Sequence, residues 1–377
     1  AAHRLSQLNP EARIVVLDAV RLGEGPAGRN SGFMIDLPHD LASDDYGGAL
    51  GADLAQTRAN RAGIGFAAEM AARFGLGEEA FAQTGKINAA ASAKGHAHNE
   101  AFARRLTSMG EAHQILDAQA MRDLTGTGYY RSGLFTPGAA MIQPAMFVRG
   151  VAAGLRSNRV AVYEQSPVTA LTRDGADWVA QTPGASVRAP KVILAVNGHA
   201  NSFGLFKGRF LHVFTYASMT RALSGDEVAR LGGQPRWGVT PADPMGTTVR
   251  RISGTGGDRI VIRNRFTCDP SMKVSAARIR AVGRDHDRAF AARFPMLEGV
   301  GMDYRWGGRL CLSWNNVQAL AQPEPGLLTA CCQNGLGTAK GTLIGKLAAE
   351  WASGHGSDLL DEMRAQDAPR KLPPAPL

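Results

Sequence analysis

The sequence has no long hydrophobic run and few cysteines. Its apolar stretches fall far below the ~18 residues of a membrane-spanning helix, so no membrane span is expected. The four cysteines contain no C-x-x-C pair, which excludes common zinc and redox spacings. The adjacent Cys331 and Cys332 are poorly placed to bridge each other. We therefore expect free thiols, no metal site and a cytoplasmic location.

Lysine is also scarce. Only 8 of the 42 basic residues are lysines, and 33 acidic residues leave a net charge of +9. Binding of nucleic acid requires a concentrated basic patch, whereas these arginines are scattered, so no nucleic-acid partner is expected. The densest group lies within 250–265. Solvated charges are the first interpretation of this group, and attraction of an anionic substrate is the alternative.

Glycine, in contrast, is abundant, with 45 residues and no triplet period. The absent period excludes collagen and places the excess in turns and loops. The segment 23–33 contains four glycines, and glycine lets backbone N–H groups approach a phosphate or a flat ring. A flexible linker is the alternative, but the flanking apolar residues favour a binding loop. The candidate cofactor-binding residues of this loop are Gly28, Arg29, Asn30, Ser31 and Gly32.

The first residues have the pattern of a βαβ unit. The end of an amphipathic helix over 1–8, a turn and an apolar strand over 13–17, which ends at Asp18, match the second half of such a unit. In dinucleotide-binding folds an acid at this position accepts hydrogen bonds from a ribose. The alternative is that Asp18 is a turn residue that ends the strand and binds no ligand.

A second glycine-rich segment, 333–341, lies between a strand and a helix. The helix N-terminus presents free N–H groups and positive potential. Such a helix start would raise the electron affinity of a flavin. Gly335, Leu336, Gly337 and Thr338 are the candidate binding residues, and we expect Lys340 to point to solvent.

Strand–helix units of the parallel type lie at both ends and in the middle of the chain, with antiparallel strands between them. The predicted helices are 52–74, 98–108, 117–124, 144–155, 273–293 and 338–353, and the predicted strands are 160–164, 168–171, 178–182, 187–189, 191–196, 209–222, 246–253, 259–266, 304–313 and 327–332. This order predicts an α/β (α+β) fold in which a discontinuous Rossmann-like domain carries an inserted antiparallel-sheet substrate domain.

The expected domain boundaries follow the same pattern. The nucleotide-binding domain takes 1–80, 144–205 and 305–360, and the substrate domain takes 81–143 and 206–304. A tail, 361–377, completes the chain. Its end is rich in proline, and we expect disorder there.

Several segments, in this order, together resemble one family. Ile14–Asp18, the loop 23–32, and the segments 133–144, 163–171, 192–198, 304–310 and 334–339 are similar to FAD-dependent amine and amino-acid oxidases of the D-amino-acid oxidase and glycine oxidase group. The gamma-glutamylputrescine oxidase branch is the most similar. The resemblance implies that FAD is the cofactor, that the Val168 backbone contacts adenine, and that Asn197 and Gly198 lie beside the cofactor.

The resemblance also implies a reaction. A hydride passes from the carbon of a small amine or amino acid to flavin N5, and O2 or another acceptor reoxidises the flavin. This chemistry requires positioning rather than a catalytic triad, and no Ser-His-Asp arrangement is evident. A flavin dehydrogenase that passes electrons to a quinone or partner subunit, and a non-catalytic member that has lost FAD, are the alternatives. A homo-oligomer is left open.

Four residues are candidates for the substrate site. Asp36 and His39, which follow the glycine loop, are the candidate amine-binding groups, and Tyr216 lies on a strand that would roof the pocket. Arg309, which follows Trp306-Gly-Gly, is a candidate for contact with the flavin edge or with a substrate carboxylate. The alternatives are a loop cap for the first two, a core aromatic for Tyr216 and a surface ion pair for Arg309.

The sequence departs from the family at two places. Family members begin with a strand and a G-x-G-x-x-G turn, which this sequence lacks. We therefore expect an upstream segment of roughly 15 residues in the native protein, judged from the strand–turn part of a βαβ unit. The stretch 313–318 also differs from many relatives, which leaves the substrate open.

Overall fold

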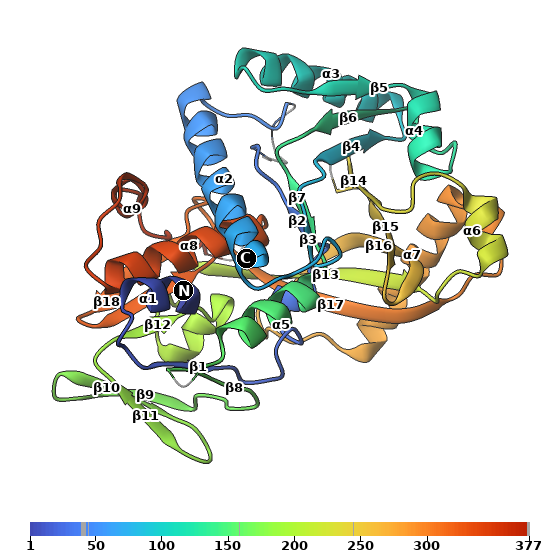
Figure 1. Cartoon of the computed structure of the whole chain (residues 1–377). Helices are drawn as coiled ribbons and strands as arrows, with labels where there is room; N and C mark the ends of the chain where they lie inside the picture. The colour runs from blue at the N-terminus through green and yellow to red at the C-terminus, as the bar shows by residue number, and fades with distance from the viewer. Residues whose placement is uncertain (39–42, 44, 158, 244, 375–377) are drawn as a thin grey trace.

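The computed structural model describes residues 1–377 except 39–42, 44, 158, 244 and 375–377. The described strands form five sheets, one of them large and the others of two or three strands. Helices and strands are mixed along the chain, which confirms the predicted fold class (Figure 1).

The large sheet has eight strands in the order β17-β13-β16-β15-β14-β4-β6-β5. All neighbouring pairs are antiparallel except β14 and β4. The strand bounds are β4 (Lys86–Ala90), β5 (Gln114–Leu116), β6 (Ser132–Thr136), β13 (Phe210–Thr220), β14 (Trp237–Pro241), β15 (Thr248–Gly254), β16 (Gly257–Cys268) and β17 (Met302–Ser313).

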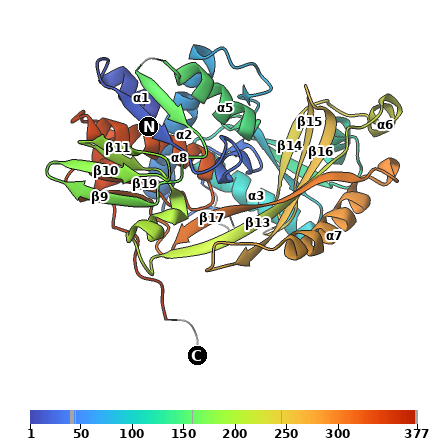
Figure 2. The ribbon, with the colours of Figure 1, turned by 90° about the horizontal axis from the view of Figure 1, so that it is seen from below.

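One face of this sheet carries a hydrophobic core. Helix α7 (Ala276–Arg293) lies along β13, β16 and β17, and Val282 packs with Phe214 and Tyr216 (Figure 2). Further along the same face, a larger cluster joins Val239 and Ile262 to the end of α7. Because side chains alternate along a strand, the intervening residues point to the opposite face, which the candidate site occupies.

Two parallel strand pairs form the predicted nucleotide-binding part. β1 (Ile14–Leu17) pairs with β8 (Val160–Tyr163), and β12 (Val192–Leu194) pairs with β19 (Leu327–Cys331). β18 (Ala319–Glu324) adds an antiparallel strand to β19. Among the described strands, β1 and β12 each leave one edge unpaired. The upstream strand expected from the sequence stays a prediction.

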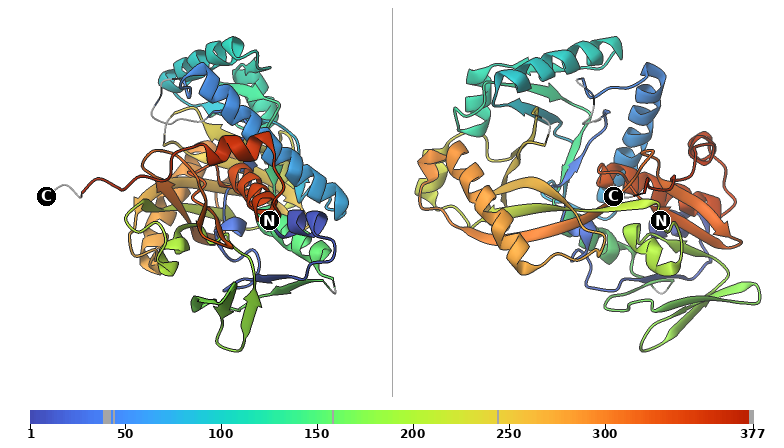
Figure 3. Two further views of the ribbon diagram at one scale, coloured as in Figure 1. Left: turned by 90° about the vertical axis from the view of Figure 1, so that its left-hand side faces the viewer. Right: turned by 180° about the vertical axis from the view of Figure 1, so that it is seen from behind.

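Helices cover these parallel strands. α1 (Ala2–Leu8) and the N-terminus lie beside α8 (Gly337–Ala352), and α2 (Leu50–Arg73) packs along α8 (Figure 3). α5 (Pro144–Leu155) lies near the N-terminal end of β8, with Pro144 in its first turn as predicted. None of the described helices is both long and apolar enough to cross a bilayer.

Smaller elements complete the chain. β9 (Ala170–Asp174), β10 (Asp177–Gln181) and β11 (Ser186–Ala189) form an antiparallel sheet, and β2 (Phe33–Met34), β7 (Ala140–Ile142) and β3 (Phe81–Ala82) form another. The remaining helices are α3 (Ala93–Ser108), α4 (Ala118–Thr125), α6 (Gly225–Leu231) and α9 (Asp358–Arg364), with the short turns η1 (Pro26–Gly28), η2 (Asn197–Phe203) and η3 (Pro295–Leu297).

Some sequence-based expectations differ from the structure. β17 pairs with β13 along its whole length, so residues 305–313 belong to the large sheet. The predicted tail begins inside α9, and its later part is held to the body, since the Leu372 N–H donates to the Gly208 carbonyl. Disorder at 369–374 is therefore the wrong expectation, and 375–377 lie outside the described residues.

Candidate functional site

The glycine loop 23–32 is a tight, self-bonded turn. The Asn30 side chain donates to the Ala27 carbonyl (2.7 Å) and accepts from the Gly32 N–H (2.8 Å). A Cβ at Gly28 would lie 2.0 Å from the Gly23 oxygen. Gly32 has a φ of +82°, which L side chains rarely adopt. The predicted flexible-linker alternative does not describe this loop, because its geometry depends on glycine.

The loop is fixed to the large sheet. The Trp306 indole N–H donates to the Arg29 carbonyl (2.9 Å), and Arg250 Nη1 donates to the carbonyls of Ser31 and Ile142 (both 2.8 Å). Arg250 is buried, and burial lowers the pKa of its guanidinium to about 10. The cation thus orders a loop that the sequence assigned to the cofactor.

A second arginine, Arg263, lies on the same face of the sheet. It pairs in register with Ala217 of β13 and with Thr248 of β15, two residues from Arg250. This face points away from α7, because Phe214 and Ser218 of the alternate set contact that helix. Arg263 stacks over the Phe266 ring at 4.5 Å.

Arg263 has no compensating negative charge nearby. Burial lowers the pKa of its guanidinium to about 10, with no carboxylate counteracting that effect. Within the described ranges, no carboxylate oxygen lies within 4.0 Å of it. The predicted solvated interpretation is therefore wrong for the buried Arg250, and for the half-buried Arg263 the alternative, attraction of an anionic substrate, stays a prediction.

Two buried lysines add to this positive potential. Lys86 donates to Asn88 Oδ1 (2.6 Å), and burial lowers its pKa to about 8 although Asp36 opposes the shift. Burial likewise lowers the pKa of Lys340 to about 8. The expectation that Lys340 points to solvent is wrong, because α8 packs its first turn into the body, where Ala339 contacts the Met34 cluster.

The second glycine segment leads into α8 as predicted. Gly335 has a φ of +81°, and the N-cap residue Leu336 places no side-chain acceptor on the first-turn N–H groups. Gly337 and Thr338 are the first residues of the helix. The N-terminus of this 16-residue helix has no side-chain cap, so its free N–H groups present positive potential. Together with the glycine turn at 23–32, it fits a flat, anionic cofactor such as FAD.

Asn197 and Gly198 connect the two halves of this region. Asn197 Oδ1 accepts from the Cys332 N–H (3.1 Å) and from Cys311 Sγ (2.9 Å), and Gly198 packs against His212. The Asn197 amide therefore fixes the end of β19 to β17. The four cysteines are free, and Cys311 and Cys332 are buried.

Asp18 and Val168 lie near the carboxyl ends of the first parallel pair. Asp18 follows β1, and its Oδ1 accepts from the Val20 N–H (3.0 Å). No hydrogen bond is made by Oδ2 within the described part of the chain. Val168 lies in the loop between β8 and β9, two residues before the strand begins, rather than in a strand. Both are placed at the edge where α/β folds bind nucleotides.

The predicted substrate-site residues are not all brought together. Asp36 is fully buried and ion-paired with Arg61 (2.9 Å). Tyr216 faces α7, and its hydroxyl shares a hydrogen bond with Thr267 (2.6 Å). Arg309 contacts His199 and donates to the Met272 carbonyl (3.2 Å), also on the α7 face. His39 lies outside the described residues.

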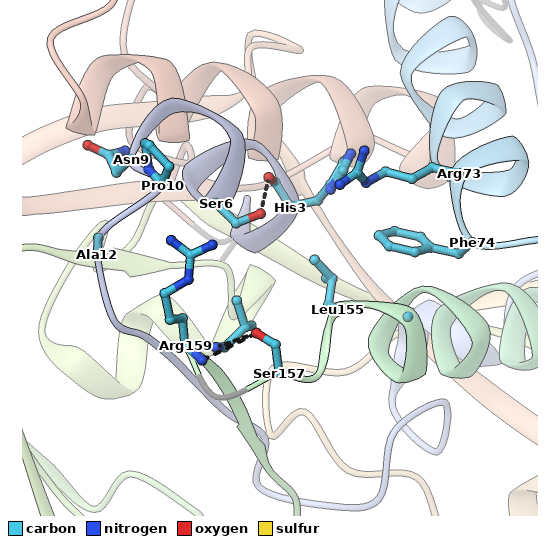
Figure 4. A pocket seen from close by; sticks show the side chains of 12 residues that line it. His3, Ser6, Asn9, Pro10, Ala12, Arg73, Phe74, Leu155, Ser157 and Arg159 are labelled. Atoms are coloured by element: carbon cyan, nitrogen blue, oxygen red, sulfur yellow. Dashed lines mark hydrogen bonds between the residues drawn. The ribbon is translucent and has the colours of Figure 1, made fainter.

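A cavity of about 200 Å³ lies elsewhere (Figure 4). Its walls include His3 and Ser6 of α1, Arg73 at the end of α2, and Arg159 before β8. It opens at the amino ends of β1 and β8, whereas Asp18 marks their carboxyl ends. It is therefore separate from the glycine loops.

Known proteins match nearly the whole chain. OrdL of Rhizobium meliloti (strain 1021), described as a probable oxidoreductase, is 24% identical over 363 residues, covering 92% of this chain and 78% of that protein. Gamma-glutamylputrescine oxidoreductase of Escherichia coli (strain K12) is 24% identical over 366 residues, with 90% and 78% coverage.

Solved structures share the fold. Glycine oxidase from Geobacillus kaustophilus superimposes with a TM-score of 0.73 at 18% identity, covering 95% of this chain and 92% of that one. Iminodiacetate oxidase from Chelativorans sp. BNC1 gives 0.72 at 15% identity, with 98% and 96% coverage.

A family model matches most of the chain. The model described as "FAD dependent oxidoreductase" (DAO) matches residues 1–351. This confirms the predicted family and the predicted cofactor, FAD. The protein therefore belongs to the DAO family of FAD-dependent oxidoreductases.

Proposed function

We propose that this protein oxidises the CH–NH bond of a small amino acid whose carboxylate is held by Arg263. The observation that carries the proposal is a half-buried guanidinium, stacked on Phe266, with no carboxylate partner among the described residues. It lies on the sheet face to which Arg250 fixes the glycine loop.

Electrostatics support an anionic substrate. Removing a cation from water is costly unless a counter-charge is supplied. Arg250 already donates to two carbonyls, whereas Arg263 makes no side-chain hydrogen bond within the described part of the chain. A guanidinium binds a carboxylate through two parallel hydrogen bonds, which fixes orientation as well as affinity. Arg263 would thus set how the substrate lies in the cleft.

The proposed cofactor-binding residues are those of the glycine loop (Gly28, Arg29, Asn30, Ser31 and Gly32), the start of α8 (Gly335, Leu336, Gly337 and Thr338), and Asp18, Val168, Asn197 and Gly198. When bound, FAD supplies a hydride acceptor. The chain's own contribution is to orient the substrate C–H bond, to exclude water through the packed loop, and to supply positive potential from Lys340 and the α8 N-terminus.

Replacing Arg263 tests this assignment. In Arg263→Gln, kcat/KM for an amino-acid substrate should fall roughly 10- to 100-fold, the cost of losing a charge-assisted hydrogen bond. The matching amine without a carboxylate should be oxidised as well as by the wild type. Arg278→Gln, an exposed arginine on α7, is the control and should change neither. An equal loss for both substrates, with FAD retained, would show that Arg263 does not read the carboxylate.

A further inference from the structure

A second cavity lies on the other face of the large sheet. Its volume is about 340 Å³, within the size range of small-molecule sites. Its walls include Ala89, Tyr129, Tyr130, Pro241, Asp243 and Arg293. Ala89 and Tyr130 belong to the core cluster that packs opposite Arg250 and Arg263. The cavity is therefore distinct from the proposed flavin cleft.

One wall carries a buried cation without a counter-charge. Arg293, the last residue of α7, is 8% exposed and stacks over the Tyr129 ring at 4.3 Å. Its Nη1 donates to the Ala289 carbonyl (2.9 Å), while its buried Nε makes no hydrogen bond. Across the described ranges, no carboxylate lies within 4.0 Å of this guanidinium.

Another wall carries a carboxylate, Asp243, that has no described cation beside it. The Asp243 carboxylate accepts a hydrogen bond from the Ser92 hydroxyl. No arginine, lysine or histidine nitrogen that the structure describes lies within 4.0 Å of it. The same cavity thus exposes one cation and one anion that do not neutralise each other. Burying Arg293 without a counter-charge is costly, and the partly exposed Asp243 has no cation of the described residues beside it. A ligand that carries both signs would give each group a partner.

The remaining walls suit the body of such a ligand. Tyr129, Tyr130 and Pro241 supply apolar surface. Burial raises the pKa of the Tyr130 hydroxyl to about 12, so it stays protonated and able to donate near neutral pH. We propose that this cavity binds a small zwitterion, with its carboxylate on Arg293 and its ammonium group on Asp243, at a site separate from the flavin.

Calorimetric titration of the FAD-loaded enzyme, without oxygen, tests the site. The probes are glycine, β-alanine and γ-aminobutyrate, which differ in the separation of their charges, and butyrate and propylamine, which carry one charge each. We expect at least one zwitterion to bind without changing the flavin spectrum, and tenfold or more tighter than both single-charge probes.

Variants then locate the binding. Arg293→Gln and Asp243→Asn should each weaken it tenfold or more, and Arg293→Lys should retain part of it. Arg263→Gln, in the flavin cleft, should leave it unchanged. Asp243 lies in a partly exposed loop, so Asp243→Asn decides the matter if the Arg293 variants fold poorly. No zwitterion binding in the wild type, binding unaffected by Asp243→Asn, or butyrate bound as tightly as the best zwitterion would each overturn the proposal.

Discussion

Individual glycines determine the geometry of the loop 23–32, the proposed cofactor-binding loop. Gly32 combines a positive φ with a close approach to its neighbours: an added Cβ would meet Arg250 Nη1 at 1.9 Å and the Ile142 oxygen at 2.3 Å. Gly25, seven residues earlier in the same loop, has an extended conformation and open space around it. Alanine at Gly25 adds only a methyl group, whereas alanine at Gly32 also has to adopt a positive φ in a crowded place. Comparing the two variants therefore isolates the effect of the Gly32 conformation.

Gly32→Ala should therefore destabilise the protein by about 1–3 kcal/mol, through backbone strain and displacement of Arg250. The fraction of Gly32→Ala protein that retains FAD after gel filtration should also fall. Gly25→Ala is the matched control and should keep both the cofactor and the unfolding midpoint. Equal behaviour of the two variants would show that the Gly32 conformation does not matter.

A single buried residue, Lys86, should make the free energy of unfolding depend on pH. Its pKa is about 8 in the folded protein and 10.5 in an unfolded chain. Between these values the unfolded chain holds the proton and the folded chain does not, so this group makes the free energy of unfolding rise with pH. The rise is at most about 3 kcal/mol.

Lys86→Met should remove that rise, measured by urea unfolding from pH 7 to 10.5. The exposed Lys94→Met is the control and should leave the slope as it is in the wild type. A wild-type slope in Lys86→Met would contradict the burial of this charge.

Which site residues the sequence could reveal depends on the kind of signal. Glycines such as Gly28 and Gly32 can be recognised, because their spacing reflects backbone constraints. The burial of Lys340 and the partial burial of Arg263 could not be predicted, because a long side chain is buried or exposed according to surfaces that only the folded chain brings together. Strand alternation does place Arg263 with Arg250 on one face once the register is known.

At the level of elements, α7 is held to the large sheet through a buried histidine. His286 is 1% exposed, its Nδ1 shares a hydrogen bond with Ser218 (2.7 Å), and its Nε2 makes none. Burial lowers the pKa of His286 to about 4. The interface between α7 and β13 is therefore sensitive to acid.

The sign of this effect follows from the proton count. Between pH 6.5 and 4 the unfolded chain binds a proton that folded His286 does not, so stability falls as the pH falls. His286→Gln should reduce this loss by at most about 3 kcal/mol, measured by denaturant unfolding at pH 7 and pH 4. His355→Gln, at an exposed histidine, should retain the wild-type loss, and an identical loss in His286→Gln would contradict the account.

Long elements could be predicted and short ones could not. The periodicity of α2, α5 and α8 and the alternation along β13 locate these elements within a few residues. β2, β3 and β7 have two or three residues each and are strands only because they pair with one another across the chain. The predicted start of the tail at residue 361 falls inside α9, which has only seven residues.

The whole molecule places a sheet of eight strands against a glycine-rich nucleotide-binding part. The order of strand–helix units and antiparallel strands predicts this arrangement, and the fold shared with glycine oxidase agrees with it. The pairing of β17 with β13 could not be predicted, because it depends on contacts between segments about 90 residues apart. That pairing fixes Trp306 against the glycine loop, and so joins the sheet to the cofactor region.

The central claim, that FAD bound at the glycine loops enables oxidation of a substrate carrying both an amine and a carboxylate, is tested by the visible absorption of the bound flavin. Small amino acids and their decarboxylated amines are added to the enzyme without oxygen, and air is then admitted while peroxide is measured. The account predicts bleaching by an amino acid, slower bleaching by its amine, and return of the colour with peroxide formation. Bleaching by amines at equal rates, or by none of these compounds, would contradict it.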